Sequence, residues 1–103
     1  MIEFQYFEGC PHSEKTLENL RELADEGFID KDELRLVEVP DAESAEKLNF
    51  QGSPTILCNG RDIYTRTPPD SPSFSCRVYQ IDGEQTGVLS KGFIKLRLEQ
   101  MTR

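Results

Sequence analysis

Apolar and polar residues alternate with a period of two over residues 2–7, and this pattern predicts a β-strand at the start of the chain. The spacing then changes to that of an amphipathic helix, which we expect over residues 11–26. Gly27 follows directly, and glycine readily takes the left-handed conformation that ends a helix. The apolar positions of this helix are Leu17, Leu20, Leu23 and Ala24.

A second strand is expected over residues 33–39, where leucine and valine are interspersed with charged residues. A helix joins it to the first strand, so we expect the two strands to be parallel in a right-handed β-α-β unit. Pro40 ends this strand, and Asp41 is a good N-cap for a short second helix. The apolar positions of that helix are Ala42, Ala45 and Leu48.

Asn59-Gly60 separates two short strand-like runs, and this pair is a strong signal for a two-residue hairpin turn. We therefore expect an antiparallel hairpin of residues 55–58 and 61–64, which returns the chain toward the start of the first helix. In an alternative topology, residues 76–81 form the fourth strand and pair with 55–58. The first topology is favoured because the Asn-Gly turn closes a hairpin by itself.

Residues 65–89 are rich in proline, serine and aspartate, which predicts a loop inserted before the last helix. Within this insert, residues 76–81 have the composition of a short strand that ends at Asp82-Gly83. Ser90 can then cap a final helix. The apolar positions of that helix are Phe93, Ile94, Leu98 and Met101.

The length of 103 residues predicts one domain, 1–103, with a substantial core. A net charge of −7 argues against nucleic acid or an anionic membrane surface as a partner. No apolar run approaches the roughly 20 residues of a membrane-spanning helix, and no signal peptide is evident. Three cysteines are an odd number, which excludes a fully paired disulfide framework, so a cytoplasmic location is expected.

Cys10 falls where the first strand turns into the first helix. Pro11 suits the first helical position, because its missing N–H would have no partner there. Free backbone N–H groups and the positive end of the helix dipole then favour the thiolate of Cys10. We therefore expect its thiol pKa to lie below the reference of about 8.5. The alternative is that Cys10 only fills space beneath the helix.

This order of elements, with a cysteine at the first strand-to-helix turn and a proline opening the third strand, resembles the thioredoxin superfamily. The Cys10-Pro11-x-Ser13 segment and the hairpin from Pro54 to Gly60 are most similar to the glutaredoxin branch. The resemblance implies an α/β fold of order β-α-β-α-β-β-α, with a mixed central sheet flanked by helices. It covers residues 2–64 and the last helix. Three shorter motifs also resemble small prokaryotic thioredoxin-like proteins associated with organomercury lyases: Gly-Ser-Pro-Thr at 52–55, Asn-Gly-Arg-Asp at 59–62 and Cys-Arg-x-Tyr at 76–79.

The resemblance also implies a role for each residue of these motifs. Cys10 would be the attacking cysteine, and Pro54 would be a cis-proline that faces its sulfur. Ser13 stands where dithiol members carry a second cysteine, so a dithiol cycle within this motif is excluded. His12 would stabilise the thiolate, although an exposed polar residue on the first turn is an equal alternative. The residues assigned to substrate binding are Pro11, Ser53 and Thr55.

Two departures from the glutaredoxin pattern make glutathione an uncertain cofactor. Gly87-Val88-Leu89-Ser90 replaces the usual Gly-Gly and acidic residue before the last helix, and Glu8 replaces a basic residue before the cysteine. Of the other two cysteines, we expect Cys58 to be structural, at the end of its strand away from Cys10. Cys76 is the candidate resolving cysteine, and mild oxidation is expected to join it to Cys10.

The leading hypothesis is a monothiol thiol–disulfide oxidoreductase, in which Cys10 attacks a disulfide of a protein or small molecule. The resolving thiol would come from glutathione, a partner protein or Cys76. One alternative is a non-catalytic binding module that uses the groove beside Pro54. Another is a handler of soft metals or thiol adducts that uses Cys10 and Cys76. Zinc-ligand spacing is absent, so no metal site is expected.

Overall fold

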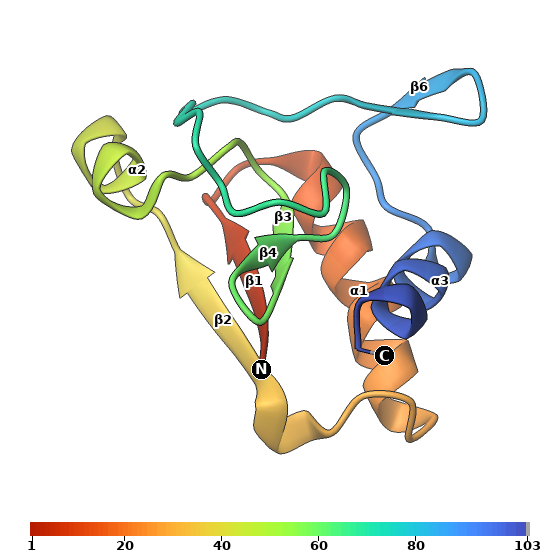
Figure 1. Cartoon of the computed structure of the whole chain (residues 1–103). Coiled ribbons are helices and arrows are strands. Elements are labelled where there is room, and N and C mark those ends of the chain that lie inside the picture. The colour runs from red at the N-terminus through yellow and green to blue at the C-terminus, as the bar shows by residue number, and fades with distance from the viewer. Residues whose placement is uncertain (103) are drawn as a thin grey trace.

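The computed structural model describes residues 1–102, and its first strand, β1 (Ile2–Tyr6), lies inside a four-stranded sheet (Figure 1). The strand order is β2-β1-β3-β4. The edge strand β2 (Leu34–Glu38) runs parallel to β1, as expected for a β-α-β unit. On the other side, β3 (Thr55–Cys58) runs antiparallel to β1, and β4 (Arg61–Asp62) runs antiparallel to β3. The protein is therefore an α/β protein with a mixed sheet.

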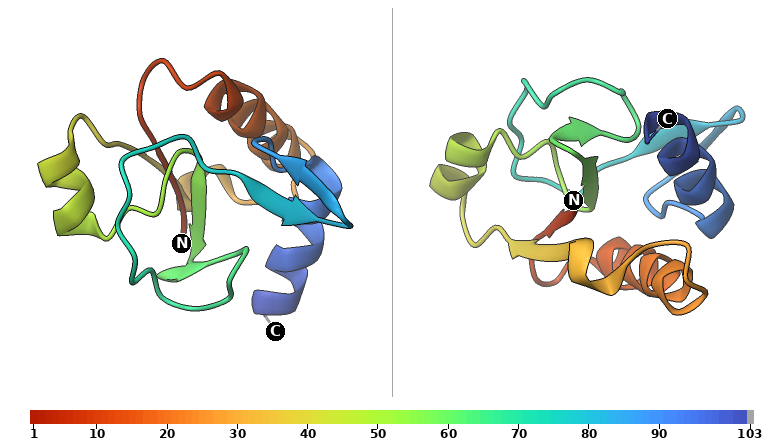
Figure 2. Two further views of the ribbon diagram at one scale, coloured as in Figure 1. Left: turned by 90° about the horizontal axis from the view of Figure 1, so that it is seen from above. Right: turned by 60° about the horizontal axis from the view of Figure 1, so that its bottom comes forward.

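Two helices pack together on one side of this sheet (Figures 1 and 2). They are α1 (Pro11–Asp25) and α3 (Lys91–Met101). The expected periodicity is confirmed, because the apolar faces of both helices meet the same face of β1 and β3. The side chains shared by this core include Phe4, Leu20, Leu23, Ile56, Ile94 and Leu98.

The expected helix boundaries are also confirmed by their capping interactions. Gly27 has a φ of 83°, so it ends α1 in the left-handed conformation. Asp41 caps α2 (Ala42–Leu48), since its carboxylate accepts the N–H of Ser44 at 2.8 Å. Ser90 caps α3 in the same way, through the N–H of Phe93 at 3.1 Å. A short 3₁₀ helix, Lys31–Glu33, precedes β2. None of these helices, within residues 1–102, is long and apolar enough to span a membrane.

The third and fourth strands form the hairpin that the Asn59-Gly60 pair predicts. Both turn residues have positive φ angles, 51° and 86°, as a tight two-residue hairpin turn requires. The prediction that the fourth strand covers residues 61–64 is wrong in extent, because β4 ends at Asp62. The side chain of Asp62 accepts the N–H of Tyr64 at 2.7 Å and bends the chain into a turn.

The alternative topology, in which residues 76–81 pair with 55–58, is wrong. Residues 79–81 form β5 (Tyr79–Ile81), which pairs only with β6 (Glu84–Thr86) in a separate two-stranded hairpin. The prediction of a strand over 76–81 is also too long, because Cys76 pairs instead with Ser53 in an isolated parallel bridge. The segment between β4 and β5 crosses the top of the sheet on its way to this hairpin (Figure 1).

Two glycine-to-alanine changes test these local assignments. Gly60→Ala should destabilise the fold by about 1 kcal/mol, because its φ of 86° disfavours a Cβ atom although no neighbouring atom is in the way. Gly92→Ala should stabilise α3 by about 1 kcal/mol, because alanine is the better helix former and its Cβ meets open space. Urea unfolding of the reduced proteins measures both. Changes of the same sign would contradict the assigned backbone conformations.

Candidate functional site

Cys10 is the N-cap residue of α1, and its backbone is extended. Only 2% of the residue is exposed. Its sulfur contacts two groups that are far away in the sequence. The Cys76 sulfur lies at 3.6 Å, and the backbone carbonyl oxygen of Ser53 also lies at 3.6 Å. The chain thus places two thiols in direct contact at the N-terminus of a helix.

Cys76 reaches this position because it belongs to the segment 73–77, here named the strap, in which Ser75 and Arg77 pair with the backbone of Ser53. The N–H of Ser53 donates to the carbonyl of Ser75 at 2.9 Å, and its carbonyl accepts the N–H of Arg77 at 2.8 Å. These two hydrogen bonds lie on either side of Cys76 in the sequence. The Ser53–Pro54 peptide bond is cis, as the resemblance implied. Tyr79 donates its hydroxyl proton to the carbonyl of Pro54, which ties the end of this segment to the same loop.

A buried ion pair fixes the strap beside the thiol pair. The guanidinium of Arg77 lies 2.6 Å from a carboxylate oxygen of Asp62, and the two side chains are 11% and 1% exposed. Arg77 also donates to the hydroxyl of Thr55 at 3.0 Å and stacks over the Tyr79 ring at 4.6 Å. The same carboxylate oxygen of Asp62 also accepts the side-chain amide of Gln51 at 2.8 Å, and the other oxygen accepts the backbone N–H of Tyr64 at 2.7 Å. Since every charged group here has partners, the pair stabilises one position of the strap.

The strap also packs closely on the backbone at Gly52. A Cβ atom added at this glycine would lie 2.9 Å from the Cβ of Arg77, so no larger residue fits. The φ of Gly52 is 115°, a conformation that other residues rarely adopt. On the other side of the strap, the ring of Phe74 contacts that of Phe7 at 5.0 Å between ring centroids. Backbone, charge and aromatic contacts therefore hold the strap together.

The two thiols differ in acidity. Burial raises the pKa of Cys10, but hydrogen bonds with Ser53, the His12 N–H, the Cys76 thiol and the Ser13 N–H outweigh it. The net pKa of the Cys10 thiol is therefore lowered from its ordinary value, in the expected direction. Cys76 shifts the opposite way, because its hydrogen bond to Cys10, then desolvation and the neighbouring negative charge, raise its pKa. Cys10 is therefore the more acidic of the two thiols, and the Cys76 thiol donates its hydrogen bond to the Cys10 sulfur.

The other residues of the predicted motif surround this pair in different ways. Ser13 is buried, and its hydroxyl donates to the Cys10 carbonyl at 2.8 Å rather than to the sulfur. Pro11 is exposed at the first position of α1, and Thr55 is buried beneath the strap, where it receives Arg77. The structure therefore places Thr55 in support of the strap and not at an open substrate surface.

His12 reaches the sulfur only through its backbone N–H. Its imidazole makes no hydrogen bond within residues 1–102 and packs against Gly87 instead. A Cβ atom at Gly87 would lie 2.2 Å from the ring carbon Cδ2 of His12, so only glycine leaves room for the ring. The imidazole of His12 therefore packs against Gly87, and the expected contact between the imidazole and the thiolate is not observed. Periodicity in the sequence gives no signal for this contact.

Cys58 lies at the far end of β3, where it pairs with Ile2 and belongs to the hydrophobic core. It is 2% exposed, and burial raises the pKa of its thiol. The expectation of a structural cysteine away from Cys10 agrees with this position. All three cysteines are free thiols.

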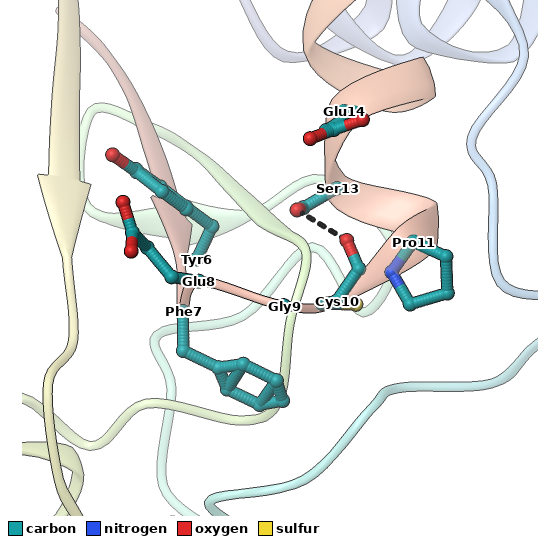
Figure 3. A pocket seen from close by; sticks show the side chains of 8 residues that line it. All are labelled: Tyr6, Phe7, Glu8, Gly9, Cys10, Pro11, Ser13 and Glu14. Carbon is teal, nitrogen blue, oxygen red and sulfur yellow. Dashed lines mark hydrogen bonds between the residues drawn. The ribbon is translucent and has the colours of Figure 1, made fainter.

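A cavity of about 390 Å³ lies between the end of β1 and the first turn of α1 (Figure 3). Tyr6, Gly9, Cys10 and Ser13 contribute to its wall, together with the carboxylates of two acidic residues, Glu8 and Glu14. Basic side chains are absent from this lining. The side-chain charges that line this cavity are therefore negative. In the part of the chain that the structure describes, no three metal-ligating side chains gather at one place.

Comparisons with protein-family models, with curated proteins and with solved structures found no match to this chain. The site is therefore interpreted from its own geometry. Cys10, Ser53, Pro54 and Cys76 come together as anticipated, whereas sequence reasoning missed the roles of Asp62 and Arg77. The available signals were that Arg77 directly follows the candidate resolving cysteine, and that Asp62 and Arg77 each belong to one of the short motifs noted above.

The acidity of Cys10 can be measured from the ultraviolet absorbance of thiolates against pH. In the reduced protein, one cysteine should titrate below the ordinary thiol value of about 8.5. Cys10→Ser should remove this transition, and Cys76→Ala should move it to higher pH because a hydrogen-bond donor is lost. Cys58→Ser is the control and should leave it unchanged. A low transition that persists in Cys10→Ser would contradict the assignment.

The ion pair makes a separate prediction about stability. Asp62→Asn removes the charge that Arg77 needs in a buried site and should lower the free energy of unfolding by about 3 kcal/mol. Lys47→Met is the matched control, because Lys47 and Glu43 are 74% and 79% exposed and such pairs contribute at most about 1 kcal/mol. Urea unfolding of the reduced proteins compares them. Equal effects of the two substitutions would show that the buried pair does not hold the strap.

Proposed function

We propose that this chain is a thioredoxin-like thiol–disulfide oxidoreductase in which Cys10 and Cys76 form the redox pair. The observation that carries the proposal is the 3.6 Å contact between their sulfur atoms. A disulfide bond of about 2.05 Å requires these atoms to approach by roughly 1.5 Å, a small movement for a loop. The order of elements, the cis-proline at Pro54 and the helix N-terminus at Cys10 support the thioredoxin-like assignment.

The reaction is thiol–disulfide exchange. The two thiols of the reduced protein and an external disulfide R–S–S–R become the Cys10–Cys76 disulfide and two R–SH molecules, so that two electrons and two protons move to the substrate. Cys10 and Cys76 supply the two thiols of this exchange, and Cys76 replaces the second cysteine that Ser13 cannot provide. Glutathione is therefore not needed to resolve a mixed disulfide.

The alternative of a non-catalytic binding module has less support. That hypothesis needs an open groove beside Pro54, but the strap already pairs with both backbone groups of Ser53. The alternative of a soft-metal handler is supported by the contact between the two sulfur atoms, because two adjacent thiols can ligate a soft metal ion. Metal handling predicts stoichiometric binding of such an ion without turnover of disulfides.

Oxidation and turnover test the proposed function together. Mild oxidation of the full chain should remove two hydrogens by intact mass, and peptide mapping should join Cys10 to Cys76. The chain should also catalyse reduction of a small disulfide by an external thiol. Cys10→Ser and Cys76→Ser should each lower this activity at least tenfold, whereas Cys58→Ser should retain it. A linkage through Cys58, or activity in Cys10→Ser equal to that of the wild type, would contradict the proposal.

A further inference from the structure

The more acidic of the two thiols is buried, and the less acidic one is exposed. Cys10 has the lowered pKa but is only 2% exposed, whereas Cys76 is exposed and lies on the outside of the pair. Transfer of a disulfide to a protein sulfur requires contact between the attacking and attacked sulfur atoms. An external molecule therefore meets the Cys76 sulfur first.

The strap prevents direct approach to Cys10. Its hydrogen bonds to Ser53, at 2.9 Å and 2.8 Å, cover the backbone beside the Cys10 sulfur. The buried Arg77–Asp62 pair holds the strap in that place, and the close fit at Gly52 leaves no space beneath it. Direct attack by Cys10, which is only 2% exposed, on an external disulfide would require the strap to move away from its sulfur. Attack at Cys76 requires no such movement.

On the basis of the proposed function, we infer that Cys76 is the cysteine that exchanges with external partners, and that Cys10 resolves the mixed disulfide formed there. This assignment reverses the roles that the position of Cys10 at the helix start first suggested. The exposure of Cys76 also determines which disulfides can be substrates. Disulfides of any size can react if one sulfur reaches the exposed strap, so protein disulfides qualify as well as small molecules.

The first step uses the hydrogen bond between the sulfurs as a proton path. The Cys76 thiol passes its proton to the Cys10 thiolate, 3.6 Å away, and becomes the nucleophile. The Cys76 thiolate attacks R–S–S–R, so that the R–S–S–R bond breaks and a Cys76–S–S–R bond forms. The leaving R–S⁻ takes the proton from Cys10 and departs as R–SH, which restores the Cys10 thiolate.

In the second step, the Cys10 thiolate attacks the Cys76 sulfur, which already lies close to the separation of a near-attack geometry. The Cys76–S–R bond breaks, the Cys10–Cys76 bond forms, and the second R–S⁻ takes a proton from water. The reverse reaction begins with an external thiolate that attacks Cys76 in the oxidised protein. Cys10 is then the leaving group, and its lowered pKa makes it leave faster.

The experiment identifies the first sulfur that is modified. The full-length reduced protein is mixed with hydroxyethyl disulfide, quenched with acid at successive times and digested with trypsin. Cleavage after Lys15, Lys47, Arg61, Arg66 and Arg77 separates the three cysteines into the peptides 1–15, 48–61 and 67–77. The earliest adduct should lie on peptide 67–77 and should decay into the Cys10–Cys76 disulfide. An earliest adduct on peptide 1–15 would overturn the inference.

Two variants extend this measurement. Cys76→Ala should consume the probe at least tenfold more slowly than the wild type, because only the covered thiol is left at the site. Cys10→Ala should accumulate a lasting adduct on Cys76, because the thiol that would resolve this adduct is absent. Cys58→Ser is the matched control and should follow the wild type. Cys76→Ala that reacts as fast as the wild type would overturn the inference.

A large disulfide probe distinguishes the exposed Cys76 from the buried Cys10, because only an exposed sulfur can react with a bulky molecule. A disulfide attached to a polyethylene glycol chain should modify wild-type Cys76 within a few-fold of the rate of the small probe. The same polymer should be at least tenfold slower than the small probe in Cys76→Ala. If the Cys10–Cys76 disulfide forms normally but the first adduct is on Cys10, the proposed function stands and this inference fails. If that disulfide never forms, the proposed function itself fails.

Discussion

The buried ion pair between Asp62 and Arg77 is the interaction on which the thiol site depends. Asp62 ends the short strand β4, while Arg77 directly follows Cys76 in a segment without regular structure. Two charges in such a place are stable only when each has its full set of partners, and here backbone N–H groups, Gln51 and Thr55 complete that set. Moving the strap would leave these charges unpaired. The sheet thus determines where the exposed thiol lies.

This arrangement makes the strap an intramolecular partner of the cis-proline loop. Ser53 presents one N–H and one carbonyl, and both are taken by residues of the same chain. A tethered segment competes with external peptides at an effective concentration in the millimolar range or above. A peptide that pairs with the same edge must therefore bind very tightly to displace it. The site is consequently better suited to exchange at the exposed sulfur than to recognition of an extended peptide.

The sequence predicts those features that depend on neighbouring residues. The turn of Cys10 and Pro11, the caps Asp41 and Ser90, and the Asn59 hairpin all follow from local backbone chemistry, and all are observed. The course of the insert depends instead on contacts across the chain. Residues 76–81 have strand-like composition, but the strand begins only at Tyr79. Cys76 pairs instead with Ser53, which is far away in the sequence. The His12–Gly87 contact and the Arg77–Asp62 pair carry no periodic signal and could not be predicted.

The charge of the whole molecule adds a constraint on the thiolate. With a net charge of −7 and two carboxylates at the neighbouring cavity, the long-range field opposes another negative charge at Cys10. Salt screens this field within about 8–10 Å, whereas the donors that contact the sulfur act at hydrogen-bond range. The short-range donors therefore dominate, and the Cys10 pKa is lowered despite burial and repulsion. One of these donors is the Cys76 thiol, so the acidity of the buried cysteine depends on the exposed one. In the proposed reaction, oxidation would join the two sulfurs and would remove the thiolate and its unfavourable charge together.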